Sequence, residues 1–109
     1  MIVKLENREF DLNANGAFMK KYQELFKEDV IQALYKSMQE KNILTCAQLT
    51  YCAIKTDLSF DEWLDSFETP LFILQEMDNI HTFLIRSVEP TVKPIKENKE
   101  VTDDSKKKD

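Results

Sequence analysis

Apolar and charged residues alternate at the start of this 109-residue chain. The alternation runs through residues 3–6 and again through residues 9–12, on either side of Asn7-Arg8. A period of two with one apolar face predicts a short antiparallel hairpin over residues 2–12. Because two strands alone are marginally stable in water, we expect the apolar face to pack on helices.

From Ala14 to Lys41 no proline interrupts the chain, but the apolar stripe changes direction. At 100° per residue the two halves of this segment point to nearly opposite sides, and one straight helix cannot bury both against one core. The first stripe is Ala14, Phe18, Tyr22 and Leu25, and the second is Val30, Ile31, Leu34 and Met38. We therefore predict two helices with a break at Lys27–Asp29, the second capped by Asp29 with Gln32 three residues later.

Capping patterns predict two further helices. Thr45 with Gln48, and Ser59 with Glu62, each match the spacing of a capping box, in which two side chains satisfy two free backbone N–H groups at a helix start. Asn42 is expected to end the preceding helix in the left-handed conformation.

A last helix is predicted from Thr69 as N-cap, with Pro70 at its first position, to about Ser87, before Pro90. Residues after that proline are rich in charge and poor in aliphatic side chains, and such a segment cannot repay its ordering entropy.

The predicted fold class is therefore mainly α. A short N-terminal β-hairpin packs on a compact bundle of about five helices over residues 1–89, and residues 90–109 form a disordered charged tail. The composition agrees, because the chain has one glycine and three prolines, whereas sheet proteins need many tight turns.

The distribution of charge narrows the function classes. Residues 1–89 carry nine basic and fifteen acidic side chains, whereas residues 90–109 carry six lysines and five acids. An acidic folded part repels phosphate backbones, so we expect no nucleic-acid partner. No apolar run reaches the length of a membrane span, and no segment resembles a signal peptide, so we expect a reducing cytoplasm.

Candidates for chemistry are few, and we expect no catalytic residue, no metal and no cofactor. Cys46 and Cys52 are six apart, about 9 Å along a helix, which is too far for a disulfide. They are interpreted as reduced core residues. His81 falls on the apolar arc of the last predicted helix and is interpreted as a residue at the edge of the core.

The strongest competing site is a calcium loop over Asp57–Glu68. Carboxylates occupy most of the ligand positions, but Glu62 stands where the loop needs glycine. The same residues form the capping box of Ser59, which excludes a loop. We prefer the helix and keep calcium binding as the less favoured alternative.

Phe72 and Phe83 are eleven residues apart, which on one helix places them within about 20° of each other, beside Glu76. They are interpreted either as a widening of the core face or as an aromatic patch for protein–protein contact. These three residues are the candidate partner-binding site.

The layout resembles that of the tail assembly chaperones of long-tailed bacteriophages. The opening IVKLENREFDLN followed by FMKKYQELF is similar to the family's hairpin and first helix, and TCAQLTYCAI and LSFDEWLDSF resemble its later helices. The likeness covers about residues 1–88 and contains no catalytic motif. Arg8 departs from the glycine that would suit the hairpin turn.

This resemblance implies a non-enzymatic protein of the host bacterial cytoplasm that is absent from the mature virion. It would bind the tape-measure protein and help the major tail-tube protein to polymerise, with self-association as a further possibility. The family often makes a longer product by ribosomal frameshifting, and Lys106-Lys107-Lys108 is compatible with a slippery stretch. The alternative is a small acidic helical module that binds and regulates a host or phage protein.

Overall fold

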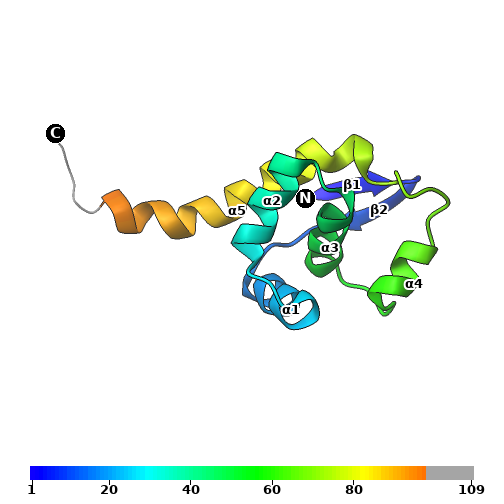
Figure 1. Ribbon diagram of the computed structural model, residues 1–109, viewed down its shortest axis with the longest axis horizontal. Coiled ribbons are helices and arrows are strands. Elements are labelled where there is room, and N and C mark those ends of the chain that lie inside the picture. Colours follow the sequence, from blue (N-terminus) through cyan, green and yellow to red (C-terminus); the bar gives the residue numbers. More distant parts are fainter. Residues whose placement is uncertain (98–109) are drawn as a thin grey trace.

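The computed structural model describes the backbone of residues 1–97 and the side chains of residues 1–88 (Figure 1). The predicted fold class, a mainly α protein with an N-terminal hairpin and five helices, is confirmed for this part of the chain. Residues 98–109 of the predicted tail lie outside the described residues. The elements are β1 (Ile2–Leu5), β2 (Arg8–Asp11), α1 (Gly16–Phe26), α2 (Val30–Glu40), α3 (Ile43–Ala53), α4 (Phe60–Asp65), the 3₁₀ helix η1 (Leu74–Glu76) and α5 (Met77–Glu97).

The hairpin forms as predicted, but its turn lies one residue earlier. β1 and β2 are antiparallel with Leu5 opposite Arg8, so the turn consists of Glu6 and Asn7 alone. Both have positive φ, 51° and 68°, as a two-residue turn with the twist of the strands requires. The prediction of a turn at Asn7-Arg8 was wrong because Arg8 already belongs to β2.

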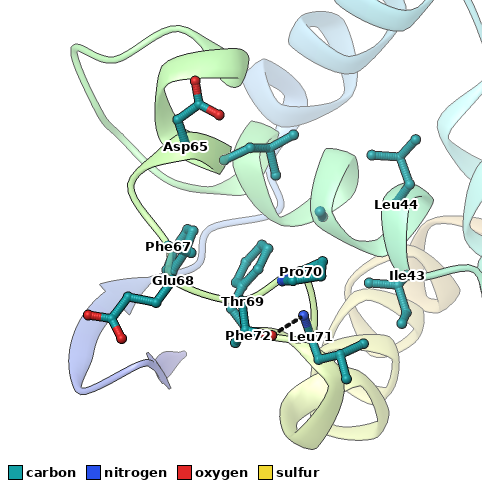
Figure 2. Close-up of a pocket in the computed structure, with 11 residues that line it drawn as sticks. Ile43, Leu44, Asp65, Phe67, Glu68, Thr69, Pro70, Leu71 and Phe72 are labelled. Carbon is teal, nitrogen blue, oxygen red and sulfur yellow. Dashed lines mark hydrogen bonds between the residues drawn. The ribbon is translucent and has the colours of Figure 1, made fainter.

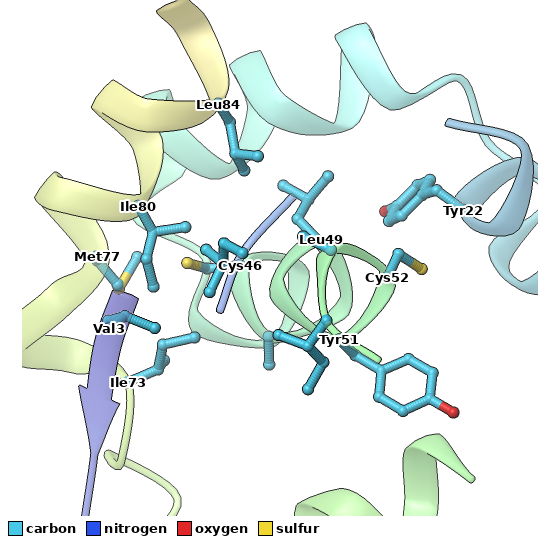
Figure 3. Close-up of a cluster of buried hydrophobic side chains, with 14 of the residues drawn as sticks. Val3, Tyr22, Cys46, Leu49, Tyr51, Cys52, Ile73, Met77, Ile80 and Leu84 are labelled. Atoms are coloured by element: carbon cyan, nitrogen blue, oxygen red, sulfur yellow. The ribbon is translucent and has the colours of Figure 1, made fainter. Parts of the chain in front are cut away.

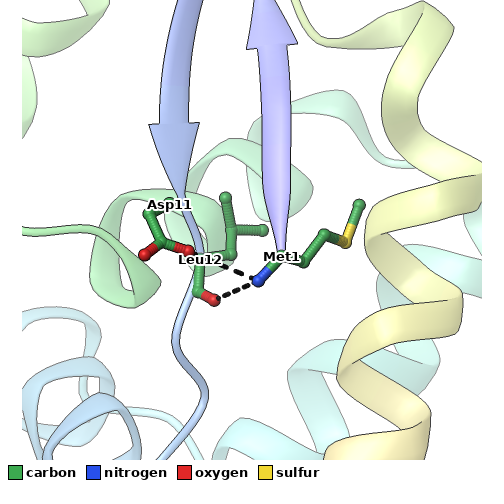
Figure 4. A network of polar contacts seen from close by, with 3 residues as sticks. All are labelled: Met1, Asp11 and Leu12. Carbon is green, nitrogen blue, oxygen red and sulfur yellow. Dashed lines mark hydrogen bonds and ion pairs between the residues drawn. The ribbon is translucent and has the colours of Figure 1, made fainter.

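The first residue is tied to the open end of the hairpin (Figure 4). The amino group of Met1 donates to the carbonyl of Leu12 at 3.1 Å and lies 3.4 Å from Oδ1 of Asp11. The N–H of Leu12 in turn donates to the carbonyl of Met1 at 2.7 Å. These bonds extend the pairing of the two strands by one residue each at the open end of the hairpin.

The predicted break between the first two helices is confirmed. Lys27 ends α1 in the left-handed conformation, with φ 57°. Asp29 begins α2, and its Oδ2 accepts from the N–H of Gln32 at 3.0 Å. The reversal of the apolar stripe therefore marked a true change of direction.

The start of α3 corrects the sequence prediction. Asn42 is the N-cap of α3, with Oδ1 accepting from the N–H of Thr45 at 3.0 Å, and Lys41 ends α2 with φ 54°. Asn42 was therefore assigned to the wrong helix end, and Thr45 is not a cap. Thr45 lies inside the helix and is buried, because α3 is enclosed by other elements.

Helix α3 is the centre of the fold, with eight of its eleven residues buried. It packs against α1, α2, α4 and α5. Its buried face meets α5 and β1 in a common apolar core (Figure 3). The residues of that core with no exposed surface include Leu5, Tyr22, Cys46, Leu49, Ile73, Ile80 and Leu84.

Helix α4 confirms the predicted capping box. Oγ of Ser59 accepts from the N–H of Glu62 at 3.1 Å, and Oε1 of Glu62 accepts from the N–H of Ser59 at 2.9 Å. Trp63, in the middle of α4, is 1% exposed.

Trp63 belongs to a chain of aromatic rings that joins β2, α1, α3, α4 and the segment after α4. Each ring centroid lies within 6.4 Å of the next, and most pairs are tilted or edge-to-face, the arrangements that aromatic rings prefer. The members of this aromatic cluster are Phe10, Tyr22, Phe26, Tyr51, Phe60, Trp63, Phe67 and Phe72.

The last helix was predicted to begin at Thr69, and this start was wrong. Residues 66–73 form a loop of turns instead, and Oγ1 of Thr69 accepts from the N–H of Leu71 at 3.2 Å. These turns place the consecutive residues Phe72 and Ile73 in the core together.

At its other end, α5 continues to Glu97 instead of stopping near Ser87. A helix can continue through Pro90 when it gives up one backbone hydrogen bond. Figure 1 shows this part of α5 extending away from the other helices. Within residues 1–97, no helix combines the length and apolarity needed to cross a bilayer.

Candidate binding groove

A groove of about 490 Å³ opens on the surface between α3, α4 and the segment that follows α4 (Figure 2). One wall is the first turn of α3, the second is the end of α4, and the third is the 66–73 loop. We call it the apolar groove, and its lining residues are Ile43, Leu44, Ala47, Leu64, Asp65, Phe67, Glu68, Thr69, Pro70, Leu71 and Phe72.

Two leucines on opposite walls stand out at the rim. Leu44 is 54% exposed and Leu71 is 53% exposed, although both are large and apolar. Below them the groove ends on Phe67 and Phe72, whose rings are stacked at 3.9 Å with 8° between their planes. An exposed apolar patch over a rigid aromatic base is typical of a surface that binds another molecule.

The polar groups of the groove do not form a site for chemistry. The hydroxyl of Thr69 is already bonded within the loop. Asp65 and Glu68 are exposed, and Figure 2 shows the Glu68 carboxylate pointing outwards. None of the lining residues is basic. A small polar ligand would find no buried group to orient it.

The hairpin turn holds the loop wall in place. The Glu6 carboxylate accepts from the N–H of Glu68 at 2.9 and 3.2 Å and from the N–H of Thr69 at 3.1 Å. Arg8 Nη2 donates to Oγ of Ser66 at 2.8 Å, and its guanidinium lies 4.2 Å from the centre of the Phe67 ring. The groove is therefore shaped by two residues more than fifty positions away in sequence.

The structure separates the three residues predicted to bind a partner. Phe72 is 9% exposed and lies at the base of the groove, before the helical segment begins. Phe83 is partly buried on α5 and is not a lining residue of the groove. Glu76 lies in η1 and accepts from Nδ2 of Asn79 at 3.2 Å. The helical phase that grouped Phe72 with Phe83 does not exist.

Sequence reasoning missed the two rim leucines. Leu44 sits beside the predicted cap at Thr45, a position where an apolar side chain normally packs against the helix start. Leu71 follows Pro70 and was placed inside a helix. The available signal was weak, since an apolar residue next to a cap or proline normally packs locally.

His81 lies at the edge of the core, as predicted, and is 6% exposed. Its Nε2 is 2.7 Å from Oγ of Ser37, so the pair joins α5 to α2. Burial lowers the pKa of His81 below its ordinary value; Asp78 opposes this shift and Lys41 adds to it. We therefore interpret His81 as a structural residue whose ring is hydrogen-bonded within the fold.

Cys46 and Cys52 are free and buried, as predicted. Burial raises the pKa of each thiol to about 12, which removes the thiolate needed for nucleophilic chemistry. In the described residues no three His, Cys, Asp or Glu side chains gather as metal ligands. The Asp57–Glu68 segment contains α4, so the helix interpretation is confirmed over the calcium loop.

Comparison of the chain with protein-family models, curated protein sequences and solved structures gives no match. The resemblance to tail assembly chaperones thus rests on sequence layout. The apolar groove is the feature of the structure that bears most directly on function.

Proposed function

We propose that this protein is a non-enzymatic binding protein that covers an apolar segment of another polypeptide, and that it acts as a phage tail assembly chaperone. The observation that carries the proposal is the pair of half-exposed leucines, Leu44 and Leu71, that line two different walls of the apolar groove. The partner's identity, the tape-measure protein, comes from the resemblance in sequence layout.

The physical role follows from the partner's shape. A long helical tape-measure chain has apolar stripes that would aggregate before the tube encloses them. An open groove lined by leucine and phenylalanine buries part of such a stripe, in the manner of a helix-in-groove complex. The net charge of −5 keeps the complex soluble in the host bacterial cytoplasm.

An open groove also favours release. The groove is open to solvent and mostly apolar, so affinity comes from apolar contact spread along the partner. Binding of that kind gives way when tail-tube subunits offer a larger apolar surface. The chaperone then leaves the assembling tail and is absent from the finished particle.

The test is co-expression with the tape-measure protein of the same phage, whose gene is expected next to this one. The unchanged protein should keep the tape-measure protein in the soluble fraction, and the double variant Leu44→Ser/Leu71→Ser should not. Leu25→Ser is a matched control, since Leu25 is 50% exposed on α1, outside the groove. Equal solubility with all three proteins would contradict the proposal.

Gene order distinguishes this proposal from a small acidic regulator of a host or phage protein. A chaperone gene is expected between the genes for the tail-tube and tape-measure proteins. The same nucleotide sequence decides on frameshifting, because the codons of Lys106-Lys107-Lys108 either form a slippery stretch before an overlapping frame or do not.

A further inference from the structure

We infer that the occupant of the apolar groove is an amphipathic helix whose apolar stripe is flanked by lysine or arginine where it passes Asp65 and Glu68. The inference rests on the proposed function and adds the chemistry of the partner. Three observations support it. The backbone N–H groups of the loop wall already have hydrogen-bond partners, the charged side chains at one end of the groove are acidic, and the loop wall is held in a fixed shape.

The loop wall offers an extended peptide no backbone donors. The N–H groups of Glu68 and Thr69 donate to Glu6, and the N–H groups of Leu71 and Phe72 donate to Thr69. Pro70 has no N–H. A strand added here would leave its own carbonyls without partners on this wall, whereas a helix satisfies its backbone internally and presents only side chains.

The charge at the end of the groove selects a basic partner. Asp65 and Glu68 lie on either side of Phe67, and no basic side chain lines the groove. The one guanidinium nearby, on Arg8, is engaged with Ser66 and the Phe67 ring. Acidic residues on the partner would be repelled here and basic residues attracted, most strongly at low salt.

The wall is fixed before the partner arrives. Glu6 and Arg8 hold the loop from Ser66 to Thr69 through three backbone N–H bonds, one side-chain bond and one cation–π contact. A wall already in its binding shape loses little entropy on complex formation. Glu6 is therefore a positioning residue for the groove.

The chain's own C-terminal end is a poor competitor. Residues 98–109 have the sequence NKEVTDDSKKKD, in which Val101 is the single aliphatic residue. One valine cannot form a stripe that spans two leucines. The lysines of this segment match the charge but not the apolar part of the groove.

The experiment uses the full chain and three labelled helical peptides of equal length. The first has leucines at helical spacing flanked by lysines, the second has the same leucines flanked by glutamates, and the third has the first composition with the leucine stripe scrambled. Fluorescence anisotropy should show the lysine peptide binding at least about tenfold more tightly than either of the others. Higher salt should narrow the difference between lysine and glutamate flanks.

Variants assign the effect to the groove. Asp65→Asn/Glu68→Gln should remove most of the preference for lysine flanks, and Glu6→Ala should weaken binding of the lysine peptide. Glu9→Ala is the matched control for Glu6, because Glu9 is an exposed glutamate of the same hairpin.

Several results would overturn the inference. One is equal binding of the lysine and glutamate peptides, and another is equal binding of the lysine peptide and the scrambled peptide. A third is tighter peptide binding after Lys106, Lys107 and Lys108 are changed to glutamate. That result would assign the groove to the C-terminal end of the chain itself. A dimer that Leu44→Ser dissociates would assign it to a second copy. If the peptides do not bind but the protein keeps the tape-measure protein soluble, the inference is wrong and the proposed function stands. If the lysine peptide binds but the tape-measure protein is not kept soluble, only the proposed function is contradicted.

Discussion

Both oxygens of the Glu6 carboxylate accept a hydrogen bond from the backbone N–H of Glu68, at 2.9 and 3.2 Å, across 62 residues of sequence. Glu6 itself has a left-handed φ of 51°, which a residue with a Cβ atom adopts only at some cost in energy. The tertiary contact stabilises this backbone conformation, and the hairpin turn and the loop wall therefore support each other.

Removing the Glu6 carboxylate should lower the stability of the whole domain. Hydrogen bonds to a charged group contribute about 1.5–3 kcal/mol, and exposure reduces that, so we expect Glu6→Ala to lower the free energy of unfolding by about 1–2 kcal/mol. Urea denaturation measures the change. Glu9→Ala should stay within about 0.5 kcal/mol of the unchanged protein, and an equal loss in both variants would argue against the contact.

Phe72 should behave as a core residue. It is stacked on Phe67 and meets Trp63 edge-to-face at 5.5 Å, so Phe72→Ala removes a full ring from the aromatic cluster and should lower the free energy of unfolding by about 3 kcal/mol or more. Phe83→Ala, at a partly buried position, should have a smaller effect. Thermal denaturation followed by circular dichroism gives both values, and the opposite order would contradict the packing.

Stability should fall when the pH drops below about 6.5, in part because of His81. The pKa of His81 is lower in the folded state than in the unfolded chain. At pH values between these two pKa values the unfolded chain binds more protons than the folded protein. The stabilisation is therefore fully present above this pH range and is lost as the pH falls through it. His81→Gln keeps a polar group that cannot titrate. Urea midpoints at pH 7.5 and 5.5 should differ less in this variant, and an equal difference would assign the effect to other groups.

Neither native cysteine should react with a thiol reagent while the protein is folded. Burial raises the pKa of Cys46 and Cys52 to about 12, and little thiolate exists at pH 8. Labelling with a maleimide should therefore need denaturant. A cysteine placed on the groove rim, Leu44→Cys, is the positive control and should label within minutes without it. Rapid labelling of the native cysteines would show that α3 opens readily.

Some of this fold could be read from local chemistry. The break at Lys27–Asp29 was predictable because the apolar stripe reverses there, and the start of α4 was predictable because Ser59 and Glu62 satisfy each other without help from the rest of the chain. Both predictions depend only on residues close together in sequence, and the structure confirms both.

Other elements depended on distant contacts. Asn42 and Thr45 both fit a cap, and the enclosure of α3, which needs Thr45 inside, decided between them. Thr69-Pro70 is a good helix start, but stacking with Phe67 holds Phe72 outside any helix. The apolar groove could not be foreseen, because its walls come from segments about twenty residues apart.

The four left-handed positions of the described chain are Glu6, Asn7, Lys27 and Lys41, and the single glycine occupies none of them. Glycine at a helix end such as Lys27 or Lys41 would remove roughly 1 kcal/mol of backbone strain. The protein is therefore less stable than the same fold with glycine at Lys27 and Lys41 would be. Under the chaperone role proposed above, a protein needed only while tails assemble would have no use for that reserve, and a domain of low stability would be open to proteolysis afterwards.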